Sequence, residues 1–421
     1  MPNSNRLSRF RFRLIPCLVI ASSVTPVVGG EPYHKPRIRT ITAFVRIEPA
    51  QYRQQIEEAV TVLRQAKAAF EKGGYEVQTI RITTQPFTQY IGDRHATETL
   101  DFFKSLDELS KENSFMLNTG PLTLSDSSNA GKVELLSQIL ANTRANASIV
   151  VAGEDGVHWN AIRAAAQVMK YVENHSPNGA NNFDFAAVAM VPPNVPFFPA
   201  SNHDGVGHQF SVGWEAGAFV GDVLAGAHRD LQVARGLLSS GFEQQARAVD
   251  GIAAQLEKNS GWKYMGLDPT PAPNTDSSIG EAIEKLTGTK FGSSGTLAAA
   301  AIITEAERSI TVKRVGYSGL MLPLLEDPVL AERWSEGTFD LDSLLAYSAV
   351  CGTGLDAVPL PGEVSQQRLE RIIGDVASLA FKWHKPLTAR LIPAPGKQAG
   401  DRTDFDFGVA KFPNTTVKAL R

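Results

Sequence analysis

The first half of the chain alternates short apolar runs with longer amphipathic segments. Residues 38–47 form a β-branched run that predicts a strand, and residues 50–72 place their apolar side chains at helical spacing on one face. Gly73 and Gly74 follow, as glycines commonly follow the end of a helix. The alternation continues, with strands expected at 75–83, 115–118, 148–152 and 185–191 and helices at 97–109, 132–142 and 159–172. This order predicts a mostly parallel sheet covered by helices.

The second half is interrupted by segments rich in proline and glycine, which favour loops. Two of them, residues 192–213 and 267–273, are expected to form loops on either side of a long helical region over roughly residues 215–258. Further helices are expected at 279–286, 295–306 and 366–381, a strand at 386–391 and a loop over 393–404. Ligands of α/β folds bind at loops beyond the strand ends, so these loops are the candidates for a site.

The stretch from Tyr347 to Ser365 has the strongest loop character. An apolar segment runs into Cys351, and two nearby glycines permit backbone conformations that other residues avoid. Pro361 and Gly362 then predict a sharp turn before the next helix. We expect this stretch to be a loop that reaches into a pocket.

The composition is that of a globular protein with a sizeable core. The chain has 421 residues, of which 43% are hydrophobic and 20% charged, and its formal net charge is -3. Such a chain offers no basic footprint for nucleic acid. We expect a single domain over residues 38–421 after a short linker at 31–37, with a small molecule as its partner; self-association into a homo-oligomer is left open.

The first thirty residues differ from the rest. Four arginines precede an apolar run from Leu14 to Val28, which ends in small residues, as in a secretory signal peptide. Pro16 and Pro26 interrupt that run, so no stable membrane span is expected once the segment is removed. The expected location is therefore the periplasm or the outside of the cell. A mitochondrial transit peptide or a cytoplasmic location is the alternative.

Cys351 would be the only cysteine left after removal of a signal peptide, because Cys17 lies within it. An intramolecular disulfide would then be excluded. A thiol with a lowered pKa is a nucleophile or an acid–base group, whereas free cysteine is also among the residue types most often buried in a core. Both interpretations stay open from the residues alone.

Histidines and carboxylates gather between residues 203 and 215. His203, His208 and Glu215 are residue types that bind zinc or a similar divalent metal, although their spacing matches no helical metal motif. The alternative is a polar loop whose histidines bond the backbone. His203 is also a candidate general acid or base without any metal.

Four long blocks in the second half resemble a known family. They are LDPTPAPNTDSSIGEAIE (267–284), GYSGLMLPLLED (316–327), CGTGLDAVPLPGEVS (351–365) and KPLTARLIPAPGKQAGD (385–401). They resemble the family of domain of unknown function 711, which is related to the UPF0210 proteins. The resemblance implies a ten-stranded α/β barrel like that of the pyruvate formate-lyase-like glycyl radical enzymes, with a loop hairpin in its centre. The residue pattern alone does not distinguish this barrel from an open sheet.

No radical or nucleotide cofactor is expected. Arg314-Val315-Gly316-Tyr317 lacks one residue of the glycyl radical motif and lies far from the C-terminus, where that motif belongs. The sequence also contains no fingerprint for ATP or NAD. A divalent metal remains the one cofactor that we keep as an open hypothesis.

The candidate site combines residues from the resembling blocks. Asp356 is the carboxylate that we expect beside Cys351 and His203 as the catalytic groups. An anionic substrate group would be held by cationic side chains and by backbone amides of a glycine-rich turn. These substrate-binding residues are Arg390, Lys397, Gly316, Ser318 and Gly319. By contrast, we expect Asp327 and Glu363 to cap helices.

The leading hypothesis is a non-radical enzyme that acts on a small carboxylate- or amino-acid-like substrate inside the barrel. The rival is a non-catalytic protein that binds or senses a small molecule.

Overall fold

A computed structural model describes residues 33–92, 94–407 and 412–420. The expected signal peptide at residues 1–30 lies outside the described residues. Those that are described belong to one compact unit. Within these ranges no helix is both long enough and apolar enough to cross a membrane.

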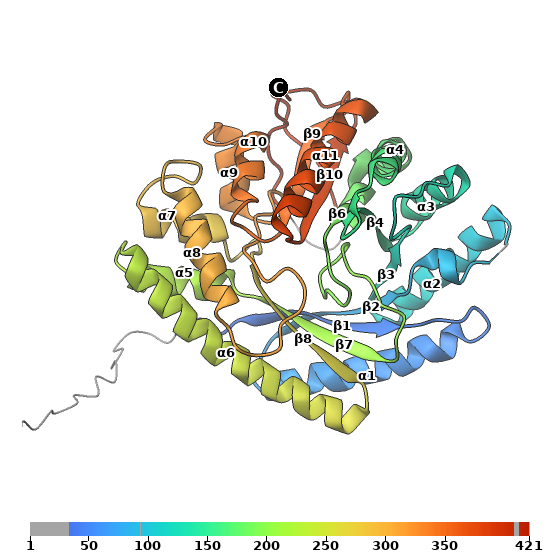
Figure 1. The fold of residues 1–421 in the computed structure, drawn as a ribbon, viewed down its shortest axis with the longest axis horizontal. Coiled ribbons are helices and arrows are strands. Elements are labelled where there is room, and N and C mark those ends of the chain that lie inside the picture. The colour runs from blue at the N-terminus through green and yellow to red at the C-terminus, as the bar shows by residue number, and fades with distance from the viewer. Residues whose placement is uncertain (1–32, 93, 408–411, 421) are drawn as a thin grey trace, which may run out of the picture. The chain divides into compact units, whose positions relative to one another are not determined.

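The unit is built on a mixed ten-stranded sheet (Figure 1). Its strands are β1 (Arg37–Val45), β2 (Val77–Thr84), β3 (Met116–Pro121), β4 (Asn146–Gly153), β5 (Gly156–Val157), β6 (Phe185–Ala189), β7 (Gln209–Glu215), β8 (Lys263–Ala272), β9 (Gly354–Pro361) and β10 (Leu387–Ala394). Their order is β8-β7-β1-β2-β3-β4-β6-β10-β9, and the short β5 pairs with β4. Strands β1, β2, β3, β4 and β6 are parallel to one another. The pair β7 and β8 on one side and the pair β9 and β10 on the other run in the opposite direction. The ten-stranded, mostly parallel α/β prediction is thus confirmed.

Helices lie along the outer side of this sheet (Figure 1). They are α1 (Tyr52–Lys72), α2 (Ala96–Asn113), α3 (Ala130–Asn142), α4 (Trp159–His175), α5 (Gly217–Gly226), α6 (Leu231–Ser260), α7 (Ile279–Thr287), α8 (Thr296–Arg308), α9 (Pro328–Glu336), α10 (Leu341–Tyr347) and α11 (Gln366–Trp383), with 3-10 turns η1 (Phe87–Gln89) and η2 (Pro177–Asp184). Helix α1 shows the principle: Ile56, Leu63 and Phe70 recur at helical spacing and are buried, which fixes the face that packs on the sheet.

Two proline-containing segments that the sequence predicted as loops are strands. Pro269 and Pro271 lie in β8, and Pro359 and Pro361 lie in β9. Both strands stand at the ends of the sheet order. Proline cannot donate to a strand ladder and is tolerated at an edge, where no further strand needs its N–H. The loop predictions for residues 267–273 and for much of 351–365 were therefore wrong.

The two edge strands do not pair with each other, and an irregular segment of residues 313–324 spans the gap between them. On one side Leu267 of β8 donates to the Lys313 carbonyl at 2.9 Å and accepts from the Val315 amide at 3.0 Å. On the other side the Leu324 amide donates to the carbonyl of Asp356 in β9 at 3.1 Å. The sheet is not closed by strand pairing, but both edges are covered.

A second irregular segment, residues 192–203, packs against the inner face of the sheet. Thr42 of β1 donates its hydroxyl to the Pro196 carbonyl at 2.8 Å, and the Asn118 amide of β3 donates to the Pro199 carbonyl at 2.8 Å. The loops that fill the interior are therefore 192–203 and 313–324, and the Cys351 stretch is not among them.

Candidate functional site

A cavity of about 650 Å³ lies between the inner face of the sheet and the two inner segments. It is lined by residues of β1, β2, β3, β4, β8, β9 and β10, of η2 and of both segments. Its volume falls in the range of small-molecule sites.

Strand geometry aims the polar side chains into this cavity. Thr79 and Arg81 are two residues apart in β2, so their side chains lie on the same face of the sheet. In β9 and β10 the register shifts, because Ala389 pairs with Leu355 but Leu391 pairs with Val358. This β-bulge places Asp356 opposite Arg390, beside the positive-φ residue Ala357.

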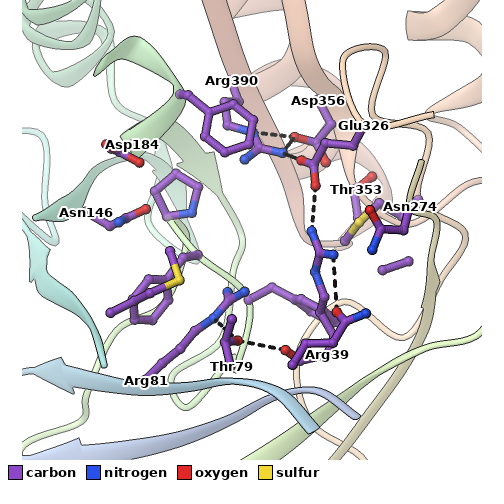
Figure 2. A pocket seen from close by; sticks show the side chains of 18 of the residues that line it. Arg39, Thr79, Arg81, Asn146, Asp184, Asn274, Glu326, Thr353, Asp356 and Arg390 are labelled. Carbon is purple, nitrogen blue, oxygen red and sulfur yellow. Dashed lines mark hydrogen bonds and ion pairs between the residues drawn. The ribbon is translucent and has the colours of Figure 1, made fainter. Parts of the chain in front are cut away.

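A chain of ion pairs, buried at Arg390 and partly buried at Arg39, crosses the cavity wall (Figure 2). The Arg390 Nε donates to Asp356 Oδ1 at 2.7 Å, and its Nη2 donates to Glu326 Oε1 at 2.5 Å. The second oxygen of Glu326 accepts from Arg39 Nη2 at 2.8 Å. Arg39 also reaches Glu215 Oε2 at 3.2 Å. Each guanidinium in this chain thus compensates the carboxylates on either side of it.

The arginines decide the charge of Glu326. Burial alone would raise its pKa, but the guanidinium groups of Arg390 and Arg39 hold the pKa of Glu326 below its ordinary value. Asp356 contacts Arg390, which also contacts Glu326, and burial raises the pKa of Asp356. Glu326 is therefore the firmly ionised member of the pair.

Arg81 is buried beside the same cavity with 6% of its surface exposed, yet it forms no ion pair with any described residue. Its Nε donates to Thr79 Oγ1 at 3.0 Å, and its guanidinium lies 4.9 Å from the centre of the Phe198 ring. Burial, with Arg39 nearby, lowers the pKa of Arg81 to about 9, while Glu326 acts in the opposite direction. The two amino groups of its guanidinium remain available as hydrogen-bond donors.

Asp184 brings a carboxylate to the cavity from the end of η2. Its Oδ2 lies 3.1 Å from Arg144 Nε, on the side chain of a residue outside the lining. Burial raises the pKa of Asp184 to about 6, although Arg144 and Arg390 oppose the rise. This side chain changes protonation close to neutral pH.

Apolar side chains form the remaining wall. Four phenylalanines, two methionines and a tyrosine line the cavity: Phe183, Phe197, Phe198, Phe412, Met116, Met321 and Tyr317. The Phe183 ring stacks on the guanidinium of Arg390 at 4.3 Å, so this ring also fixes the arginine.

Of the sequence-predicted site residues, Asp356 and Arg390 lie together at this cavity. Cys351 does not line it, because its side chain is fully buried in the hydrophobic core. Burial raises the pKa of the Cys351 thiol, and the Lys385 ammonium donates to backbone carbonyls around it, including that of Cys351. The expected catalytic group of Cys351, His203 and Asp356 is not brought together.

The expected metal ligands are also separated. The His203 ring stacks on Phe44 at 6.2 Å, and the His208 ring stacks on Trp262 at 4.7 Å. His208 precedes β7, whereas Glu215 ends that strand and pairs with Arg37 and Arg39. No cluster of three metal-binding side chains occurs among the residues in the described ranges. His203, His208 and Glu215 therefore do not form a metal site.

The glycine-rich turn binds a side chain of the protein itself. The amides of Tyr317 and Ser318 donate to the Asp268 carboxylate at 2.8 and 3.1 Å, and the Gly319 amide donates to Thr270 Oγ1 at 3.4 Å. Gly316 has φ 80°, and a Cβ there would overlap the Asp268 carboxylate. The predicted role of Gly316, Ser318 and Gly319 in holding a substrate anion is corrected, because the Asp268 carboxylate lies against this turn and the amides of Ser318 and Gly319 already donate to Asp268 and Thr270.

Lys397 was predicted to hold the same anion, but it pairs with Asp404 at 2.9 Å and does not line the cavity.

The capping prediction is right for Asp327, which accepts from the amides at the start of α9 and of α7. It is wrong for Glu363, because Ser365 caps α11.

Sequence reasoning missed Arg39, Arg81, Asp184 and Glu326 as site residues. A signal was present for Arg81, which stands between Ile80 and Ile82 in a run expected to be a buried strand. Arginine is rarely buried unless it is paired or functional.

Comparisons with known proteins bear on the family. Among solved structures, the anaerobic ribonucleotide reductase from Thermotoga maritima in complex with dATP and CTP matches 84% of this chain and 74% of its own, with 8% identity and a TM-score of 0.39. A likeness at that score carries no inference about chemistry here.

Sequence relatives cover nearly the whole chain. A UPF0210 protein from Pyrobaculum aerophilum is 28% identical over 400 residues, covering 87% of each chain. One from Desulforudis audaxviator is 28% identical over 379 residues, covering 80% of this chain and 82% of its own. The family described as Uncharacterised ACR (DUF711) matches residues 33–407. The chain therefore belongs to the DUF711 family, as the four sequence blocks predicted.

Proposed function

We propose that the protein binds a small carboxylate-bearing molecule in the cavity and that Arg81 contacts the carboxylate. The observation that carries this proposal is a buried guanidinium without an ion-pair partner among the described residues, next to a space of ligand size. Burying an unpaired charge is costly, and a bound anion would compensate it. A carboxylate fits the two free amino groups of a guanidinium in bidentate geometry.

Arg390 is less suited to this role than the sequence suggested. Its guanidinium already contacts Asp356 and Glu326, and Arg39 contacts Glu326 and Glu215. A ligand carboxylate at either arginine would have to displace a buried carboxylate of the protein. These two arginines hold the wall of the cavity, which leaves Arg81 for the ligand.

Turnover of the bound carboxylate is a second candidate function, favoured by Asp184. A carboxyl group whose pKa is about 6 exchanges its proton near neutral pH, as a general acid or base requires. It lines the same cavity as Arg81. Under this hypothesis Arg81 would position the substrate and Asp184 would transfer a proton to or from it.

A thermal-shift measurement tests the binding proposal. Purified protein from Glu31 onward is heated with acetate, benzoate or inorganic phosphate and compared with the same ionic strength of chloride. Specific binding raises the melting temperature by mass action. We expect a shift with carboxylates in the wild type and none with Arg81→Met.

Arg371→Met is the matched control, because Arg371 is exposed on α11 and does not line the cavity. It should keep the full shift. Equal shifts in the wild type and Arg81→Met, or no carboxylate shift in the wild type, would reject the proposal.

A further inference from the structure

We infer that the molecule bound at Arg81 is a monocarboxylate with an apolar, ring-containing body and without an ammonium group. This inference rests on the proposed carboxylate binding and adds the class of ligand to it. Two independent features of the cavity lead to it: how its charged groups are paired, and what covers the rest of its wall.

The pairing limits the ligand to one negative charge. Arg39 and Arg390 are compensated by Glu326, with further contacts to Glu215 and Asp356. Arg81 is then the one cation of the described lining that has no ion-pair partner. A second carboxylate on the ligand would enter a buried space without a free cation to meet it, which disfavours dicarboxylates.

The acidic side chains of the lining disfavour a ligand with an ammonium group, because each of them is already paired with an arginine. Asp184 pairs with Arg144 at 3.1 Å, and Glu76, at the rim, pairs with Arg37 at 3.2 Å. Glu326 and Asp356 are held by Arg390. An amino-acid ammonium would have to compete with an arginine for each of these carboxylates, so a zwitterion is disfavoured compared with the acid that lacks the amine.

The apolar wall describes the body of the ligand. Phenylalanine side chains reach the cavity from three separate parts of the chain: Phe183 in η2, the neighbours Phe197 and Phe198 in segment 192–203, and Phe412 near the C-terminus. Met116 and Met321 add adaptable apolar surface. A small hydrophilic acid would leave this wall without a partner, whereas an apolar body would cover it.

The position of Phe198 favours a ring in that body. Its own ring lies against the guanidinium of Arg81, 4.9 Å from Cζ to the ring centre. A carboxylate that meets the guanidinium therefore brings the atoms next to it close to an aromatic surface. Aromatic rings gain from stacked and edge-to-face contact with each other beyond the area that they bury.

Calorimetric titration with four named probes tests this inference: acetate, phenylacetate, succinate and phenylalanine. We expect phenylacetate to bind at least about tenfold more tightly than acetate, since only its ring covers the apolar wall. Succinate and phenylalanine should bind more weakly than phenylacetate. Equal affinity for acetate and phenylacetate, or tighter binding of succinate or phenylalanine, overturns the inference.

Phe198→Leu separates the ring from general apolarity, because leucine keeps an apolar side chain at the position. It should weaken phenylacetate binding several-fold and weaken acetate binding less, because only phenylacetate places a ring against residue 198. Trp383→Leu, which alters an exposed aromatic residue outside the cavity lining, should change neither. An equal loss of both affinities in Phe198→Leu despite an unchanged melting temperature would contradict the role of the ring.

The two proposals fail in distinguishable ways. If acetate binds through Arg81 but phenylacetate gains nothing, carboxylate binding stands and the apolar body is wrong. If none of the four probes binds the wild-type protein, carboxylate binding fails and the ligand class fails with it.

Discussion

Among single residues, Arg81 differs from the other charged side chains of the cavity because no described acid lies within ion-pair distance of it. In the absence of ligand its buried charge opposes folding. We expect Arg81→Met to raise the free energy of unfolding by about 1–3 kcal/mol, because it removes a buried charge that has no ion-pair partner among the described residues. Urea denaturation of the ligand-free protein measures this change.

The exposed control Arg371→Met should stay within about 0.5 kcal/mol of the wild type. A lower stability of Arg81→Met than of the wild type would mean that the guanidinium is already compensated, and the main support for the site would be lost.

Arg390 should respond in the opposite direction, because it contacts both Asp356 and Glu326. Arg390→Met leaves two buried carboxylates short of a partner, and we expect a loss of about 3–5 kcal/mol at neutral pH. The same denaturation series compares it with Arg81→Met. Similar stability changes for the two variants would contradict the distinction between a paired and an unpaired arginine.

His203 predicts a pH dependence of stability. Burial lowers the pKa of His203 from 6.5 to about 4 in the folded protein, although Asp204, whose Oδ1 lies 3.6 Å from Nε2, acts in the opposite direction. The unfolded chain therefore takes up a proton first as the pH falls. The contribution of neutral His203 is complete above pH 6.5 and is lost as the pH falls towards about 4.

Unfolding free energies of the wild type and His203→Gln, measured between pH 7 and pH 4, test this dependence. The wild type should lose stability relative to the variant as the pH falls. Parallel curves would show that His203 does not titrate differently in the folded and unfolded states.

At the scale of elements, the contact between segment 313–324 and the start of β9 depends on two glycines. A Cβ on Gly352 would overlap the backbone of Gly319, and the Gly352 amide donates to the Leu320 carbonyl at 2.7 Å. We expect Gly352→Ala to destabilise the protein by about 1–3 kcal/mol through overpacking.

Gly251→Ala is the matched control, because Gly251 lies within α6 and a Cβ there meets no atom within 4 Å apart from the nearby backbone of its own helix. It should stabilise the protein by about 0.5–1 kcal/mol, since alanine favours the helix. Thermal melts of both variants measure the difference. Equal effects would show that segment 313–324 is not held close to β9.

Element types were predictable wherever the signal is local. The spacing of Ile56, Leu63 and Phe70 marks α1, and the β-branched run marks β1. Strands β8 and β9 were missed because their prolines favour loops locally, and only their position at the sheet edges makes them compatible with a strand.

Over the whole molecule, the cavity is made by parts of the chain that are far apart in sequence. Arg39 and Glu326 are separated by 287 positions, and Arg390 and Glu326 by 64. Strand β7 pairs antiparallel with β1, and β10 pairs antiparallel with β6. Residues near the starts of β1 and β2 meet residues near the starts of β9 and β10 at one cavity. A rule based on the C-terminal ends of strands does not lead to these residues, because they lie in the first part or the middle of their strands.

The α/β class, the family, most helices and two residues that line the cavity, Asp356 and Arg390, could be predicted from the sequence. This was possible because hydrophobic periodicity and contiguous blocks are local properties of a chain. The tertiary structure was needed to show which arginine of the cavity lacks an ion-pair partner among the described residues. Arg390 and Arg81 are chemically alike in the sequence. In the folded protein Arg390 contacts Asp356 and Glu326, whereas Arg81 has no ion-pair partner among the residues that the structure describes. The tertiary structure also shows that Cys351 is a core residue and does not reach the cavity. Whether a side chain reaches a cavity depends on how distant segments pack, which the local sequence does not show.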